Sequence, residues 1–146
     1  MIKITTSIDI AAPPERVWSV LIDYEAYSAW NPFIQKMSGE FRAGARLDIQ
    51  IAPPGRRAMR FRPTVLRVEP NKELRWVGSL GMRRVFDGEH ALLLDSIGGG
   101  NTRFRQEERF FGVLAPLVMR GGLLESTRRG FIEMNEALKH RAEGAR

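Results

Sequence analysis

The first residues of the chain alternate between apolar and polar side chains. Isoleucines stand at positions 2, 4, 8 and 10, and polar residues occupy the positions between them. A repeat of two residues is typical of a strand that has one buried and one solvated face. We therefore expect a strand over residues 2–10.

Two short helices are predicted after this strand. Residues 11–15 contain two prolines and Glu15, which suit the first turn of a helix because proline is tolerated there and glutamate meets the positive end of the helix dipole. A second helix is expected from Asp23, as its N-cap, to Ala29, because Pro32 pushes the residue before it out of the helical region. The apolar face of the first helix is expected to consist of Val17, Trp18, Val20, Leu21 and Ile22.

The pattern over residues 34–110 indicates further strands separated by turns. Apolar and polar residues alternate around residues 47–51, 59–61 and 74–76, and the segments between them are rich in glycine and proline. Connections this short join antiparallel neighbours, whereas parallel strands need crossovers of about a dozen residues or more. One curved antiparallel sheet is the expectation.

Three consecutive glycines at 98–100 predict the turn of the last hairpin. If Ile97 pairs with Asn101 across this turn, one face of the hairpin carries two pairs of opposite charge. A shift by two residues would lose both charge matches, so we predict this register. Its charged pairs are Asp95 with Arg103 and Glu89 with Arg109, and its inward pairs are Leu94 with Phe104, Leu92 with Gln106 and His90 with Glu108.

A long helix is predicted over residues 114–140. Apolar or small residues fall three, four or seven positions apart, and this spacing lines one face of a helix whose other face is charged. Gly121 and Gly122 together cost roughly 2 kcal/mol relative to alanines, so the helix either starts after them or bends there. The predicted apolar stripe consists of Leu117, Gly121, Leu124, Phe131, Met134 and Leu138.

Composition narrows the class of protein. The 146 residues are 43% hydrophobic, which suits one domain over residues 1–146 with one core. The sequence has no cysteine and only two histidines, so thiol chemistry is excluded and no metal site is expected. It also has no apolar run of signal-peptide or membrane-spanning length. We expect a cytoplasmic protein.

The net charge of +6 is the compositional feature that points to a partner. A basic surface suits an anionic membrane, nucleic acid or an acidic ligand, and it suits equally well the solvated outer face of a sheet. The aromatic residues accompany aliphatic ones rather than the arginines, which argues against nucleic-acid binding. The clustered arginines are those at positions 56, 57, 60, 62, 67 and 75. The oligomeric state stays open.

The order of these elements and of several short segments resembles a known superfamily. The segments are Ile10-Ala11-Ala12-Pro13 followed by Val17-Trp18 and Asp23; Trp30-Asn31-Pro32-Phe33; Glu73-Leu74-Arg75-Trp76; Gly88-Glu89-His90; and Gly100-Asn101-Thr102-Arg103-Phe104 leading into Glu107-Glu108. Together they resemble the START-like superfamily (helix-grip, Bet v 1-like), and within it the small bacterial members related to polyketide cyclases and dehydrases.

The resemblance implies an α+β helix-grip fold. In this fold a curved antiparallel sheet of about seven strands wraps around a long C-terminal helix, with two short helices after strand one. The resemblance also implies a mostly apolar cavity between the sheet and the C-terminal helix that holds a hydrophobic small molecule. It implies no catalytic residues, because these relatives do not share one catalytic set.

His90 and Glu108 are the candidate catalytic residues. A carboxylate beside an imidazole in a pocket of low dielectric constant can hold the ring's proton and make the ring a general base. The alternative is that the two side chains only satisfy each other's hydrogen bonds at the edge of a cavity.

A further set of inward residues is predicted to contact the guest. Flat rings suit an aromatic or quinone-like molecule, although ordinary core packing explains any one of them as well. Trp30, with Asn31, can instead brace the short helices against the sheet. The predicted ligand-binding residues are Trp30, Phe61, Trp76, Leu92, Phe104, Gln106, Leu124 and Phe131.

Three functions fit these expectations, and none of them requires a cofactor. The first is binding of an aromatic, polyketide-like or lipid-like molecule for transport or sequestration. The second is a cofactor-independent cyclase or dehydrase that works by acid/base chemistry. The third is a lipid or quinone carrier that docks on an anionic membrane or an acidic partner through a basic face, and such docking would weaken as ionic strength rises.

Overall fold

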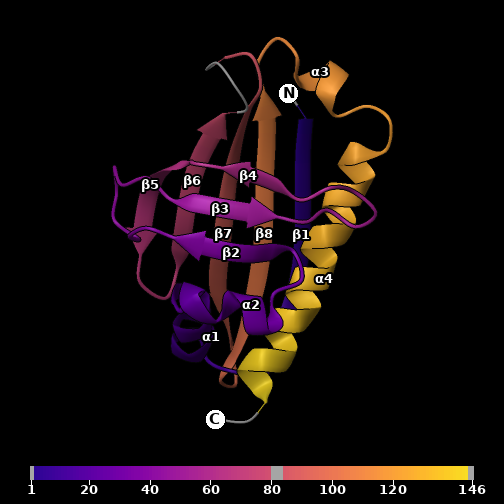
Figure 1. Cartoon of the computed structure of the whole chain (residues 1–146). Coiled ribbons are helices and arrows are strands. Elements are labelled where there is room, and N and C mark those ends of the chain that lie inside the picture. The colour runs from indigo at the N-terminus through magenta and orange to yellow at the C-terminus, as the bar shows by residue number, and fades with distance from the viewer. Residues whose placement is uncertain (1, 80–83, 145–146) are drawn as a thin grey trace.

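The computed structural model describes residues 2–79 and 84–144. Within these ranges the chain forms two antiparallel sheets and a long helix beside them (Figure 1). The elements are β1 (Ile2–Ile10), α1 (Pro14–Ile22), the 3-10 helix η1 (Tyr24–Ala26), α2 (Tyr27–Trp30), β2 (Ile34–Ser38), β3 (Asp48–Ile51), β4 (Met59–Phe61), β5 (Thr64–Glu69), β6 (Glu73–Ser79), β7 (Asp87–Gly98), β8 (Asn101–Phe111), α3 (Ala115–Val118) and α4 (Leu123–Glu143).

The two sheets are joined by the segment that precedes β3. The larger sheet has the strand order β1-β8-β7-β6-β5, and the smaller has the order β2-β3-β4. Arg46 forms a bridge with Thr64 of β5, and the Leu47 amide donates a hydrogen bond to the Pro63 carbonyl. Figure 1 shows the smaller sheet crossing in front of the larger one, with α4 along one side.

This architecture confirms the predicted α+β helix-grip fold. The described part of the chain has eight strands rather than about seven. The segment from 59 to 69 forms two strands, β4 and β5, because Pro63 lies between them and has no amide hydrogen for a continuous ladder.

The predicted first strand is confirmed, and the two helices after it are confirmed with changed bounds. Helix α1 buries Val17, Trp18, Val20 and Leu21, whereas Ile22 is 40% exposed. The expected helix over residues 23–29 divides into η1 and the single turn α2, which ends at Trp30. Asp23 is the N-cap residue of η1, as predicted, but its side chain makes no capping hydrogen bond.

The predicted register of the β7–β8 hairpin is confirmed from His90↔Glu108 to Asp95↔Arg103. Next to the turn a bulge shifts the register, so that Asn101 pairs with Gly98 and not with Ile97. The ion pair of Glu89 with Arg109 forms, at 2.9 Å.

Asp95 and Arg103, the other predicted pair of opposite charge, lie opposite each other but form no ion pair with each other. The Arg103 guanidinium binds Asp9 of β1 at 2.8 Å, and Asp95 binds Arg105 at 3.3 Å. Asp9 stands directly opposite Arg103 on β1, whereas Arg105 is the diagonal neighbour of Asp95 on β8, within reach of a long side chain.

The long helix begins after the two glycines. Gly121 and Gly122 have φ values of 64° and 86°, and left-handed residues of this kind cannot continue a right-handed helix. Phe131, Met134 and Leu138 of the predicted stripe are buried, but Leu117 is 60% exposed and lies in the separate turn α3. None of the helices that the structure describes is long and apolar enough to cross a membrane.

Candidate functional site

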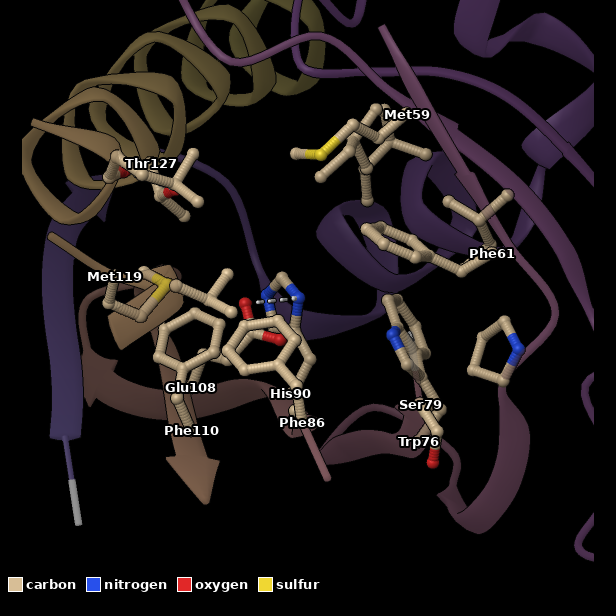
Figure 2. Close-up of a pocket in the computed structure, with 18 of the residues that line it drawn as sticks. Met59, Phe61, Trp76, Ser79, Phe86, His90, Glu108, Phe110, Met119 and Thr127 are labelled. Atoms are coloured by element: carbon tan, nitrogen blue, oxygen red, sulfur yellow. Dashed lines mark hydrogen bonds and ion pairs between the residues drawn. The ribbon is translucent and has the colours of Figure 1, made fainter. Parts of the chain in front are cut away.

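A mostly apolar cavity of about 120 Å³ lies between the two sheets and beside the first turns of α4 (Figure 2). The smaller sheet contributes Met59 and Phe61, the larger sheet contributes Trp76, and the α3–α4 segment contributes Met119 and Leu123. An apolar cavity of about 150 Å³ in another protein binds benzene. The cavity therefore has room for a guest, or part of a guest, of about one ring.

Two glycines form part of the cavity wall on the larger sheet. Gly78 of β6 pairs with Gly88 of β7, next to the pair of Trp76 with His90, and all four residues line the cavity. A Cβ atom on Gly88 would lie 2.7 Å from Glu108 Oε2. The missing side chain at Gly88 therefore leaves the space that the Glu108 carboxyl occupies.

His90 is buried among aromatic rings. Its ring stacks on Phe131, with centroids 4.8 Å apart, and lies 5.2 Å from the Trp76 ring. Burial lowers the pKa of His90 to about 4, although the hydrogen bond that its ring donates to Gln106 acts in the opposite direction. The imidazole is therefore neutral at neutral pH.

A chain of hydrogen bonds fixes the proton on the His90 ring. Gln106 Nε2 donates to Asn135 Oδ1 at 2.8 Å and to the Phe131 carbonyl at 3.2 Å, and Asn135 Nδ2 donates to Thr6 Oγ1 at 3.0 Å. The Gln106 Oε1 atom must then accept the 2.9 Å hydrogen bond from His90 Nε2. His90 Nδ1 consequently carries the lone pair.

Glu108 faces that lone pair. Its Oε1 atom lies 3.8 Å from His90 Nδ1, as the dashed line in Figure 2 marks, which is too long for a direct hydrogen bond. Burial raises the pKa of Glu108 to about 8. At neutral pH the site thus contains a neutral carboxylic acid beside a neutral imidazole. The N–H of the imidazole donates its hydrogen bond to Gln106 and not to Glu108.

The cavity gathers four of the residues that the sequence singled out: Phe61, Trp76, His90 and Glu108. The other predicted residues lie elsewhere. Leu92, Phe104, Gln106 and Phe131 are buried without lining the cavity, Leu124 is half-buried, and Trp30 packs against Tyr27 with ring centroids 5.3 Å apart. Leu123 and Thr127 of α4 take the place expected for Leu124 and Phe131.

Several cavity residues had no clear signal in the sequence. Phe110 is the exception, because it follows Glu108 at a spacing of two and so shares the inward face of β8. Met59 and Met119 come from segments that are far apart in sequence and meet only in the folded chain.

The fold agrees with a family comparison. Residues 1–143 match the model of a family described as polyketide cyclase / dehydrase and lipid transport. The chain belongs to this family. A comparison with curated proteins gives no match.

Solved structures show the fold of the family. The Zhui aromatase/cyclase from a Streptomyces species superposes with a TM-score of 0.75 at 18% identity, over 97% of this chain and 93% of that one. A START superfamily protein from Mycobacterium smegmatis gives 0.73 at 20% identity, over 97% of both chains. A hypothetical protein from Helicobacter pylori gives 0.77 at 14% identity, over 97% of this chain and 88% of that one. These likenesses confirm the START-like fold.

Proposed function

We propose that the protein binds a hydrophobic small molecule in the cavity between its two sheets. The observation that carries this proposal is a mostly apolar cavity whose wall has, besides the Trp76 indole, only four polar side chains, two of them the neutral pair His90 and Glu108. Apolar pockets with a few placed polar groups are typical of small-molecule sites. Family membership supports the same class of ligand.

Neighbouring residues of α3 offer a matched test of the cavity. Val118 lines the cavity, whereas Leu117 is 60% exposed. Val118→Trp should fill the space and weaken binding of p-xylene, measured by isothermal titration calorimetry, by about tenfold or more, because the guest and the new ring compete for one volume. Leu117→Trp should leave the affinity unchanged. Absence of saturable binding, or equal affinity in both variants, would contradict the proposal.

A second candidate function is acid/base catalysis in the same cavity, and the neutral pair favours it. His90 Nδ1 has a free lone pair and Glu108 holds a proton. In a dehydration, His90 would remove the proton next to a ketone while Glu108 protonates the departing hydroxyl, which leaves as water and gives an enone.

A β-hydroxy ketone that carries a phenyl ring tests this second candidate, because its conjugated product absorbs strongly in the near ultraviolet. His90→Gln should abolish turnover and leave the affinity for p-xylene within about threefold, because a neutral amide keeps polarity without basicity. Turnover that survives this substitution would exclude the catalytic role.

A third candidate is a carrier that docks on an anionic membrane beside the cavity. Of the arginine cluster expected from the sequence, Arg60, Arg67 and Arg75 are paired with carboxylates. The segment around α3 instead exposes apolar residues, with Val113 80% and Leu117 60% exposed. The exposed cations beside the connection from α3 to α4 are Arg56, Arg57 and Arg120, with Arg56 donating a hydrogen bond to the Gly121 carbonyl.

Vesicles test this third candidate. Sedimentation with phosphatidylglycerol vesicles should fall steeply as salt rises, because a surface attraction is screened. Leu117→Ser should weaken it further, whereas Leu66→Ser, which changes an exposed leucine of β5, should not. Binding that ignores both salt and Leu117 would exclude this docking mode.

A further inference from the structure

Four polar side chains line the cavity, and two of them already use their donors within the protein. Ser79 Oγ donates to Asp87 Oδ1 at 2.5 Å, and Thr127 Oγ1 donates to the Leu123 carbonyl at 2.8 Å. His90 Nε2 is likewise bound to Gln106. Among the described residues, this leaves His90 Nδ1 and the Glu108 carboxyl as the groups of these four side chains that no hydrogen bond occupies, and the Trp76 indole also lines the cavity.

The spacing of these two groups suits one oxygen atom placed between them. Atoms 3.8 Å apart can both lie at about 2.8 Å from a third atom, which is an ordinary hydrogen-bond length. A protonated carboxyl donates and the Nδ1 lone pair accepts. A hydroxyl group can form hydrogen bonds with both groups at once, because its oxygen accepts one from Glu108 and its hydrogen is donated to His90 Nδ1.

The charge of the cavity wall limits the guest further. No lysine or arginine is among the residues that line the cavity within the described ranges. An anionic guest such as a carboxylate would bury its charge without a cation, which is strongly unfavourable in an apolar site. A neutral hydroxyl carries no such cost once both of its hydrogen bonds form.

We propose that Glu108 and His90 select a neutral guest that carries a hydroxyl group, and that this group lies between the Glu108 carboxyl and His90 Nδ1. The inference rests on the proposed binding function and makes these two residues the determinants of specificity. A hydrocarbon of the same shape leaves both groups unpaired. A carboxylate of the same shape is excluded.

Three probes of similar size test the proposal by calorimetry at neutral pH: p-cresol, p-xylene and p-toluate. The wild-type protein is compared with Glu108→Leu and Glu108→Gln. The preference for p-cresol over p-xylene should fall about tenfold in Glu108→Leu, which removes the donor, and should stay within about threefold in Glu108→Gln, whose amide still donates. The p-toluate anion should bind the wild-type protein at least about a hundredfold more weakly than p-cresol.

The outcomes separate this inference from the function on which it rests. An unchanged preference in Glu108→Leu, or tight binding of p-toluate, overturns the hydroxyl site while cavity binding stands. Failure of all three probes to bind overturns the binding function itself. If Glu108→Leu does not fold, the carboxyl carbon resonance of Glu108 in the labelled wild-type protein decides: p-cresol should shift it and p-xylene should not, and equal shifts overturn the proposal.

Discussion

At the scale of single residues, burial acts in opposite directions on the two titratable groups of the cavity. It lowers the pKa of His90 to about 4 and raises that of Glu108 to about 8, because a site of low dielectric constant disfavours the charged form of each. Both side chains are therefore neutral between these values. The neutral state follows from the surroundings and could not be predicted from residue types.

This pair predicts how stability depends on pH. Folded Glu108 holds its proton up to about pH 8, whereas an ordinary glutamate loses it near 4.5, so unfolding releases a proton in between and stability falls as pH rises. His90 acts oppositely between about 4 and 6.5, because the unfolded histidine binds the proton there and the folded one does not. The two effects offset each other below about pH 6.5, and above it the free energy of unfolding should decrease towards pH 8.

Chemical denaturation at a series of pH values checks this prediction. Glu108→Gln removes the titrating group and keeps the shape of the side chain. The variant should lose the decrease between pH 6.5 and 8, whose slope in the wild-type protein should reach at most about 1.4 kcal/mol per pH unit. If the free energy of unfolding decreases by the same amount in the variant, a titrating group other than Glu108 causes the decrease.

Gly130 predicts a second effect at this scale. A Cβ atom there would lie well inside contact distance of the Phe33 ring, against its Cδ1 and Cε1 atoms. Alanine improves helix propensity by about 1 kcal/mol, but overpacking costs about 1–3 kcal/mol, so Gly130→Ala should lower the free energy of unfolding by up to about 2 kcal/mol. In Phe33→Ala, which removes the Cγ, Cδ1 and Cε1 atoms that the new Cβ would meet, the same change should cost little. Equal costs in both backgrounds would contradict the clash.

At the scale of elements, the sequence predicted best where a local repeat decides the structure. Alternation located β1 and set the register of β7 with β8, and the pairing of opposite charges chose between registers. The start of α4 was harder to predict. It depends on the left-handed backbone of Gly121 and Gly122, whereas the apolar repeat in the sequence continues through these two residues. The cavity residues were predicted less well because they meet across two sheets and a helix.

Gly121 allows a test of the break between α3 and α4. Its φ of 64° is left-handed, and a Cβ atom there would meet nothing within 4 Å. Gly121→Ala should therefore lower the free energy of unfolding by about 1 kcal/mol through backbone strain alone, while Gly121→Asn, which tolerates this region better, should cost less. Thermal or urea unfolding measures the difference. Two variants of equal stability would argue against a left-handed residue at this position.

At the scale of the whole molecule, a buried polar chain holds α4 to the sheet. Asn135 of α4 is 2% exposed and joins Gln106 of β8 to Thr6 of β1. The same chain orients the His90 ring through Gln106. The attachment of the helix and the orientation of the candidate base therefore depend on the same hydrogen bonds.

Substitution of Asn135 tests this attachment. Asn135→Leu removes an acceptor from Gln106 and a donor to Thr6, and unpaired buried polar groups cost about 1–3 kcal/mol each, so the free energy of unfolding should fall by about 2–3 kcal/mol. Glu136→Leu, at the adjacent exposed position of α4, should change it by no more than about 0.5 kcal/mol. Similar losses in both variants would indicate a general effect of leucine on the helix.

The pair of Gly78 and Gly88 has a consequence for how the range of guests could change in related sequences. Both positions lie on the cavity wall, where a methyl group on Gly78 would meet Pro63 at 3.2 Å and one on Gly88 would meet the Glu108 carboxyl at 2.7 Å. Neither position has a left-handed backbone, so backbone strain excludes no residue there, but a side chain at Gly78 would press on Pro63 and one at Gly88 would displace the Glu108 carboxyl. A substitution at Gly78 would then adjust the size of the guest and one at Gly88 its polarity, so that two paired positions on adjacent strands could diversify ligand choice.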